Sequence, residues 1–325
     1  MTRMYRAILS SVFLPFAVTT AAHGAAADDY PNKPLRLIVP FPPGGSNDLL
    51  ARYFSDKLTR RLGQQVIVDN RAGANGIIGT DMASKTTADG YTLLIISTSF
   101  TMNAAVRKLP YNVHTSFDPI TLLGSSPNSI VVYPGWGVSS LKDIVDMAKA
   151  KPGSLMYAHT GVGGFNHFGG ELFKKMAHID MGPVPYKGGG PAMIDVMGGQ
   201  MKMMFSSLTQ CLPHVRSGKL KLIAVGAEKR SPVVPDIPTI AESGYPGYAV
   251  YVWWGIAAPA GAPEQALAKL TSTFSSILSD PATRKRLTNE AAEPRDMAPA
   301  EIRKLIAAEV KKWTEVAKGA GIKVN

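Results

Sequence analysis

Short apolar segments alternate with helix-like segments along most of this chain, and no other feature restricts its fold as strongly. Residues 35–40 (LRLIVP), 65–69 and 91–98 are runs rich in branched side chains, which is typical of strands. Residues 48–62 and 76–85 lie between these runs and carry apolar side chains at helical spacing. This strand–helix rhythm predicts an α/β fold with a parallel sheet flanked by helices on both faces.

The same rhythm starts again in the middle of the chain. Strands are predicted at residues 129–133, 155–160, 184–186, 201–206 and 221–226, and helices at 140–149, 166–176 and 191–197. A strand-like stretch follows at 248–258, and the tail from 263 to 316 has helical spacing. The repetition indicates two lobes, each a sheet with flanking helices.

Two breaks in the pattern, near residues 124–128 and 244–249, suggest where the chain passes between the lobes. We expect a discontinuous first lobe of residues 28–125 plus 248–325, and a second lobe of residues 126–247. A chain that crosses twice between lobes leaves a cleft above a hinge. This arrangement suits closure around a ligand.

The N-terminus has the pattern of a secretory signal peptide. Arg3 and Arg6 form a positive region, residues 7–18 form a short apolar run, and residues 25–27 are a small-residue cleavage site. We expect residues 1–27 to be removed by cleavage near Ala27. No cysteine follows that could take a lipid anchor, so we expect a soluble, periplasmic protein.

The charge and the single cysteine narrow the possible functions. Without Arg3 and Arg6 the net charge of +11 becomes +9, and the basic residues are scattered rather than gathered with aromatic side chains. We therefore expect no nucleic-acid partner but a positive field that attracts anionic ligands. Cys211 cannot form an internal disulfide, and a small buried apolar residue is the simpler interpretation than a nucleophile.

Four glycine-rich turns are the most informative motifs for function. They cover residues 40–48 (PFPPGGSND), 71–76 (RAGANG), 160–167 (TGVGGFNH) and 186–191 (YKGGGP), each just before a predicted helix. A helix N-terminus offers unpaired N–H groups and partial positive charge, and glycine lets this backbone approach a ligand closely. The glycines of any one turn could serve only a tight turn. Four of them together favour a site for carboxylate or phosphate.

Hydroxyl groups follow two of the predicted strands at the same edge of the sheets. Ser97, Thr98 and Ser99 end one strand, and Ser206 and Ser207 end another. Asp48 is most simply a first-turn residue favoured by the helix dipole. Asp195 lies one turn into its helix, where it could accept a proton from a ligand, or be solvated or structural.

Motifs of enzymes are missing from the sequence. It has no G-x-S-x-G elbow, no G-x-x-x-x-G-K-[ST] loop and no complete G-x-G-x-x-G fingerprint. His159, His167 and His178 do not have the spacing of metal ligands. We therefore expect no catalytic residue, no metal and no cofactor. A secreted hydrolase stays a weaker alternative.

Seven ordered segments resemble one family, the substrate-binding receptors of tripartite tricarboxylate transporters, also called Bordetella uptake gene (Bug) receptors. The matching segments are 40–48, 68–79 (VDNRAGANGIIG), 109–117 (LPYNVHTSF), 161–173 (GVGGFNHFGGELF), 184–199 (VPYKGGGPAMIDVMGG), 238–247 (PTIAESGYPG) and 254–261 (WGIAAPAG). The likeness runs from about residue 30 to the C-terminus. It implies a two-lobed Venus-flytrap receptor, similar to type II periplasmic binding proteins.

The resemblance also implies a ligand class and a site. Such receptors bind di- and tricarboxylates, acidic amino acids or aromatic acids, and two turns, here 41–47 and 160–164, grip one carboxylate. The candidate ligand-binding residues are Phe41, Gly45, Ser46, Asn47, Asn75, Gly76, Ser97, Thr98, Thr160, Gly161, Gly163, Gly164, His167, Asp195 and Ser206. Many relatives have Ser or Thr where this chain has Gly164, and the position of Ser46 varies.

Partners and alternatives follow from this interpretation. We expect a monomer that binds a small carboxylate and delivers it to inner-membrane transporter subunits. A secreted sensory protein for a two-component system would bind the same ligand class, and the sequence does not separate the two. Phe41, Phe100, Trp253 and Trp254 could line an aromatic-acid pocket or belong to the core.

Overall fold

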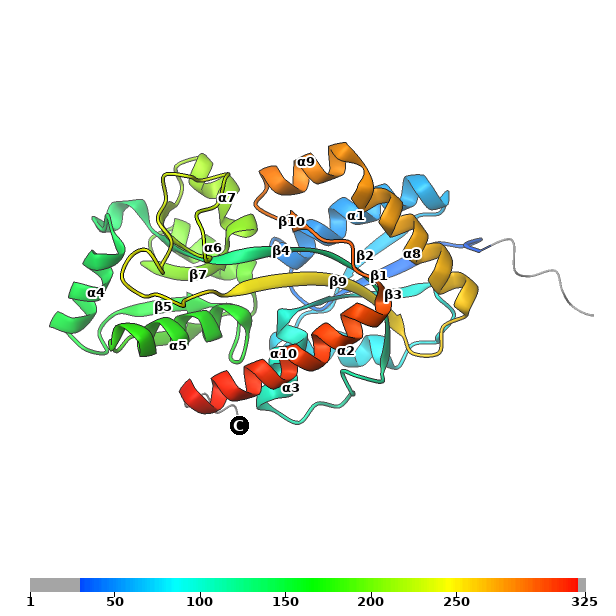
Figure 1. Ribbon diagram of the computed structural model, residues 1–325, viewed down its shortest axis with the longest axis horizontal. Helices are drawn as coiled ribbons and strands as arrows, with labels where there is room; N and C mark the ends of the chain where they lie inside the picture. The colour runs from blue at the N-terminus through cyan, green and yellow to red at the C-terminus, as the bar shows by residue number, and fades with distance from the viewer. Residues whose placement is uncertain (1–29, 321–325) are drawn as a thin grey trace, which may run out of the picture. The chain divides into compact units, whose positions relative to one another are not determined.

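The computed structural model describes residues 30–320, and the predicted signal peptide lies outside them. Within this range the strands form a two-lobed α/β protein built on one continuous sheet (Figure 1). The first half of the sheet contains β2 (Val66–Asn70), β1 (Leu35–Val39), β3 (Thr92–Ser97), β9 (Tyr251–Pro259), β4 (Phe117–Val132) and β10 (Glu293–Pro294). The second half contains β8 (Lys221–Gly226), β4 again, β7 (Met203–Ser207), β5 (Met156–His159) and β6 (Gly182–Pro185).

Helices flank both halves of the sheet. The first half carries α1 (Ser46–Leu62), α2 (Ile77–Ser84), α3 (Thr98–Val106), α8 (Glu264–Ser279), α9 (Pro281–Asn289) and α10 (Pro299–Ala320). The second half carries α4 (Leu141–Ala150), α5 (Phe165–Ala177), α6 (Gly189–Met197) and α7 (Leu208–Arg216). Short 3-10 turns lie at Ala74–Gly76 and Pro134–Trp136.

The sheet is mixed, whereas the sequence pattern predicted a parallel one. Strands β1, β2 and β3 pair in parallel, as do β5, β6 and β7. Strand β4 is antiparallel to β7, β8, β9 and β10, and β9 is antiparallel to β3. The parallel expectation is therefore confirmed for the strands that precede the glycine-rich turns, and wrong for the two long strands between them.

The expected break at residues 124–128 is not a linker, because these residues lie inside the continuous strand β4. Residues 124–127 pair with β9, and residues 128–132 pair with β7 and β8 (Figure 1). A Cβ at Gly124 would lie 2.6 Å from the backbone oxygen of Glu293 in β10. The glycine thus marks a close approach of two strands and not a flexible joint. The lobe boundaries inferred from the sequence stay a prediction.

A buried hydrogen-bond network lies where the chain passes from the second half of the sheet into β9. Asn128 Nδ2 donates to the hydroxyl of Tyr248 at 3.1 Å, and this hydroxyl donates to the Gly169 carbonyl oxygen at 3.0 Å. The Asn128 N–H donates to Val250 O at 2.7 Å. Tyr248 is fully buried, so its hydroxyl is linked to both groups without competition from water.

Helix α10 touches elements of both lobes. Its apolar stripe packs Ile302 and Ile306 into the core of the first half of the sheet. Further along, the Trp313 ring meets Phe168 of α5 edge-on, with the ring centroids 5.2 Å apart. The Trp313 Nε1–H donates to Glu309 at 2.6 Å, so the indole has its polar atom satisfied. This apolar face of α10 is core packing, and its formation as a helix agrees with the helical spacing of residues 263–316.

Two further expectations concern the rest of the described chain. Cys211 is fully buried, and this burial raises the pKa of its thiol to about 12, so the prediction of a small core residue is confirmed. Among the helices of residues 30–320, none combines the length and the apolar character that a bilayer-spanning segment needs.

The hydrogen bonds of Tyr248 can be tested for their contribution to stability where the chain enters β9. Tyr248→Phe should lower the free energy of unfolding by about 1–3 kcal/mol, because it leaves Asn128 and the Gly169 carbonyl without a buried partner. Chemical denaturation of both proteins measures this difference. Tyr251→Phe is the matched control, since Tyr251 is 36% exposed and its hydroxyl accepts a 3.3 Å bond from the Glu228 N–H. Equal stabilities of the two variants would contradict the role of the network.

Candidate functional site

All four glycine-rich turns lie at the carboxyl ends of parallel strands and lead into helices, as predicted. The turns after β1, β2, β5 and β6 open α1, α2, α5 and α6 respectively. The N-caps of α1, α5 and α6 are Gly45, Gly164 and Gly188, and none of them makes a side-chain cap bond. The first N–H groups of these helices are therefore available to another acceptor.

Turns from the two lobes approach each other so closely that only glycine fits between them. A Cβ at Gly190 would lie 2.5 Å from the Pro43 carbonyl oxygen, and one at Gly188 would lie 2.5 Å from the Pro42 ring. On the other side, a Cβ at Gly164 would lie 2.7 Å from Asn75 Oδ1. The turns of the two lobes are therefore in contact, at Gly190 with backbone and at Gly188 and Gly164 with side chains, which is the arrangement of a closed cleft.

A small inner chamber lies between these turns, with a volume of about 30 Å³. Its walls are Phe41, Gly45, Ser46, Asn47, Ser97, Ser99, Thr160, Phe165, Asn166, Gly189, Ser207, Gln210 and Val252. None of these wall residues is ionisable. The side-chain oxygens of Asn47 and Asn166 and the Gln210 Nε2 are buried and have no hydrogen-bond partner among the described residues. Such orphaned polar atoms are costly unless a ligand or water completes them.

A larger outer cavity of about 460 Å³ adjoins the chamber, and Phe41 and Thr160 line both spaces. Its other walls are Ala72, Gly73, Ala74, Asn75, Gly76, Arg107, Gly161, Val162, Tyr186 and Lys187. Asn75 is held in a left-handed conformation. Its Nδ2 donates to Asn103 Oδ1 of α3, and Asn103 Nδ2 donates to the Asn75 backbone carbonyl, each at 2.9 Å. The outer cavity differs from the chamber in carrying two cationic side chains.

The predicted site residues divide into three groups. Phe41, Gly45, Ser46, Asn47, Ser97 and Thr160 line the inner chamber, and Asn75, Gly76 and Gly161 line the outer cavity together with Phe41 and Thr160. Thr98, Gly163, Gly164, His167, Asp195 and Ser206 line neither. Contact of any of them with a ligand stays a prediction.

Several residues of the third group are engaged elsewhere. The Thr98 hydroxyl accepts the Trp253 N–H at 2.8 Å, which ties α3 to β9. Asp195 accepts the Tyr186 hydroxyl at 2.6 Å. The Ser206 hydroxyl donates to the Ser207 carbonyl at 3.3 Å. These bonds hold the walls of the site in position.

Asp48 shapes the first glycine-rich turn. One carboxylate oxygen accepts the Gly44 N–H and Arg52 Nε, each at 3.0 Å, and the other accepts Asn70 Nδ2 at 3.0 Å. Burial alone would raise the pKa of Asp48, but these hydrogen bonds outweigh it and keep the pKa below its ordinary value. Asp48 is thus a buried anchor of the turn in addition to a helix-dipole residue.

Two buried histidines support the turn at residues 160–164. His159 Nδ1 accepts the Gly161 N–H at 3.2 Å, and His167 Nδ1 accepts the Gly163 N–H at 3.3 Å. The two rings lie 4.6 Å apart. Burial, with the neighbouring His167, lowers the pKa of His159 to about 3, and burial also lowers the pKa of His167. Both imidazoles are therefore neutral at physiological pH and accept the backbone N–H groups.

The sequence interpretation missed four wall residues that matter chemically. Gln210 comes from α7, which was not predicted, and Asn166 follows the third glycine cluster by two positions. Gly189 lies in the fourth turn, and Arg107 ends α3, another unpredicted helix. Of these four residues, only Asn166 and Gly189 lie in the glycine-rich motifs. Only these two could therefore have been predicted from the sequence.

Comparison with known proteins identifies the family of this chain. Residues 50–322 match the family described as tripartite tricarboxylate transporter family receptor. The chain belongs to this receptor family. The receptor is 35% identical over 321 residues to the protein BugT of Bordetella pertussis, and the match covers 98% of each chain.

Solved structures of similar proteins share the fold. MatC from Rhodopseudomonas palustris, solved with bound malate, is 30% identical with a TM-score of 0.83, covering 88% of this receptor and 99% of that chain. A second R. palustris protein, solved with adipate, is 33% identical with a TM-score of 0.88, covering 91% and 99%. The periplasmic binding protein BugD is 33% identical with a TM-score of 0.87, covering 90% and 99%.

The buried histidines predict a specific acid sensitivity of the receptor. Unfolded histidine binds a proton below about pH 6.5, while folded His159 does so only near pH 3. Between these values the unfolded state holds more protons, so the free energy of unfolding should fall as the pH falls. The contribution of one histidine is at most about 1.4 kcal/mol per pH unit.

The measurement is urea denaturation of wild type and His159→Asn between pH 6.5 and 4. Asparagine keeps an acceptor near the Nδ1 position but does not titrate, so its curve should be less steep. His114→Asn, which removes an exposed histidine, is the matched control for the loss of an imidazole. Parallel curves for wild type and His159→Asn would contradict the neutral, buried state of His159.

Proposed function

We propose that the protein is a periplasmic solute-binding receptor that captures one small carboxylate between its lobes and delivers it to an inner-membrane transporter of the tripartite tricarboxylate type. The observation that carries this proposal is the family match over residues 50–322, together with solved relatives that hold malate and adipate. Binding without chemistry is the expected activity, and the receptor is expected to act as a monomer.

The chemistry of the inner chamber supports an anionic ligand. Unpaired N–H groups at the starts of α1 and α5 come from opposite lobes, and hydroxyls of Ser46, Ser97 and Thr160 lie in the same walls. A carboxylate can accept several such hydrogen bonds, and helix N-termini favour negative charge without a cationic side chain. The ligand would accept from the orphaned Gln210 Nε2 as well, and so hold the lobes together. The orphaned oxygens of Asn47 and Asn166 would instead need a donor such as a bridging water.

The reactive side chains of the region support a receptor rather than a hydrolase. The Cys211 thiol is fully buried and its raised pKa keeps it protonated. The imidazoles of His159 and His167 accept backbone N–H groups through Nδ1 and lie beneath the turn. Neither ring lines the inner chamber or the outer cavity, so neither is a base for a bound substrate.

The test is a melting experiment on protein that has been unfolded and refolded to remove carried-over ligand. A panel of mono-, di- and tricarboxylates, acidic amino acids and aromatic acids is compared with the matching amides. A ligand at a hundredfold excess over its Kd should stabilise the folded protein by about 2.7 kcal/mol. The proposal fails if no carboxylate raises the melting temperature, or if acids and their amides act alike.

A variant in the chamber separates binding from stability. Asn166→Leu should weaken binding of the best carboxylate by about tenfold or more, because it removes the side-chain Nδ2 that can donate to a carboxylate in the chamber, and a hydrogen bond to a charged group is worth about 1.5–3 kcal/mol. It should leave the stability of the unliganded protein unchanged or higher, since the buried Asn166 oxygen has no partner there.

Asn128→Leu is the matched control for this variant. Asn128 is equally buried but is bonded to Tyr248 and to the Ser129 N–H, so its replacement should lower stability. Isothermal titration calorimetry and denaturation of both variants give the two readouts. Wild-type affinity in Asn166→Leu would exclude the inner chamber as the binding site.

A further inference from the structure

Arg107 reaches across the cleft from the first lobe to the second. It follows the last residue of α3, and its Nη2 donates to the carbonyl oxygen of Val162 at 2.9 Å. Val162 belongs to the turn between β5 and α5, and both residues line the outer cavity. The guanidinium therefore lies where the two lobes meet, beside an open space.

The charge of Arg107 is not compensated by the protein. Within the described residues it forms no ion pair, and its Nε is buried without a hydrogen-bond partner. A half-buried guanidinium keeps its charge and can donate five hydrogen bonds, in a fork that matches a carboxylate. One of these donors bonds the Val162 carbonyl, and none of the others bonds a described carboxylate.

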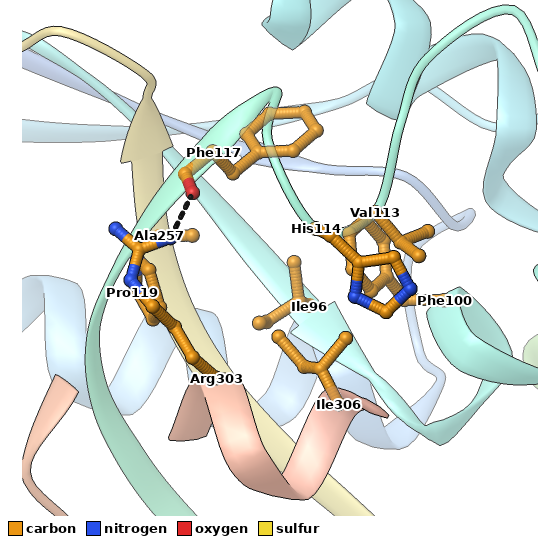
Figure 2. Close-up of a pocket in the computed structure, with 9 residues that line it drawn as sticks. All are labelled: Ile96, Phe100, Val113, His114, Phe117, Pro119, Ala257, Arg303 and Ile306. Carbon is orange, nitrogen blue, oxygen red and sulfur yellow. Dashed lines mark hydrogen bonds between the residues drawn. The ribbon is translucent and has the colours of Figure 1, made fainter. Parts of the chain in front are cut away.

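Arg303 is a useful comparison, because its guanidinium is paired with a carboxylate. It lines a separate, mostly apolar pocket of about 80 Å³ with Ile96, Phe100 and Ile306 (Figure 2). There its Nη1 donates to the Phe117 carbonyl at 3.4 Å, and its Nη2 contacts Asp118 at 2.6 Å. Asp118 neutralises Arg303, whereas no described carboxylate neutralises Arg107.

The volumes of the inner chamber and the outer cavity bear on where each end of a bound ligand would lie. The inner chamber, at about 30 Å³, is much smaller than the outer cavity, at about 460 Å³. Phe41 and Thr160 border both, so a ligand anchored in the chamber extends past them into the outer cavity. Its far end would meet a wall that carries Arg107 and the exposed Lys187.

We propose that Arg107 is a specificity-determining residue that receives a second, outer acidic group of the ligand. This inference rests on the proposed function and narrows it to ligands with two acidic groups. The first carboxylate is held by N–H groups and hydroxyls in the uncharged chamber, and the second forms a forked ion pair with Arg107. A monoacid of the same length offers Arg107 no such partner.

The experiment compares dicarboxylates with their monoamides by calorimetry on the refolded full chain. Succinate, glutarate and adipate are the probes, each matched with its monoamide. Wild type should bind the preferred diacid at least tenfold more tightly than the monoamide. Arg107→Gln should weaken the diacid at least tenfold and the monoamide less than threefold, and Arg107→Lys should keep part of the preference for the diacid.

The controls separate recognition from closure of the lobes. Arg61→Gln removes an exposed arginine whose Nη1 donates only to Ser276, and it should bind like wild type. If Arg107→Gln lowers the affinity for diacid and monoamide equally, then Arg107 serves only to hold Val162 through its hydrogen bond. That result would overturn the inference. Monocarboxylates that bind as tightly as diacids would also overturn it while leaving the proposed function intact. Absence of binding by every carboxylate would instead defeat the proposed function.

Discussion

The pairing of β4 with β9 is the interaction on which the rest of the structure depends. These two strands lie against each other over residues 117–127 and 251–259, and β4 then continues into the second half of the sheet. Both lobes are therefore fixed to one continuous hydrogen-bonded ladder. The buried bonds among Asn128, Tyr248 and Gly169 close the point where the chain leaves this ladder.

From this ladder the parallel strands of each half direct their carboxyl ends toward the cleft. The turns that follow β1 and β5 open α1 and α5, whose glycine N-caps leave N–H groups without side-chain partners. Asp48 fixes the first of these turns, and two neutral histidines support the second. A ligand that accepts hydrogen bonds from both turns stabilises the closed arrangement, and this links binding to the position of the lobes.

Local sequence patterns predicted the parts of the fold that depend on local physics. The glycine-rich turns and the helices after them were predicted, because helix starts and apolar periodicity can be recognised from residues that are close together in the sequence. The first half of β4 was missed, since Gly124, Ser125 and Ser126 resemble a linker and become a strand only through pairing with β9 and β10. Helices α3 and α7 were missed because they begin directly after a strand.

The wall residues missing from the predicted site were also missed because local sequence patterns do not mark them. Gln210 and Arg107 come from α7 and the end of α3, and no motif in their surroundings marks them as wall residues. Thr98 and Asp195 are bonded to Trp253 and Tyr186, and their contact with a ligand stays a prediction. Which side chain turns inward is decided by long-range packing that a single sequence does not display.

Hydrogen–deuterium exchange with and without the tightest-binding carboxylate tests the central claim most directly. The account predicts that amides in residues 44–48 and in residues 161–167 become protected together, because one ligand joins turns from both lobes. Protection confined to one lobe, or no protection at either turn by a ligand that raises the melting temperature, would contradict capture in the inner chamber.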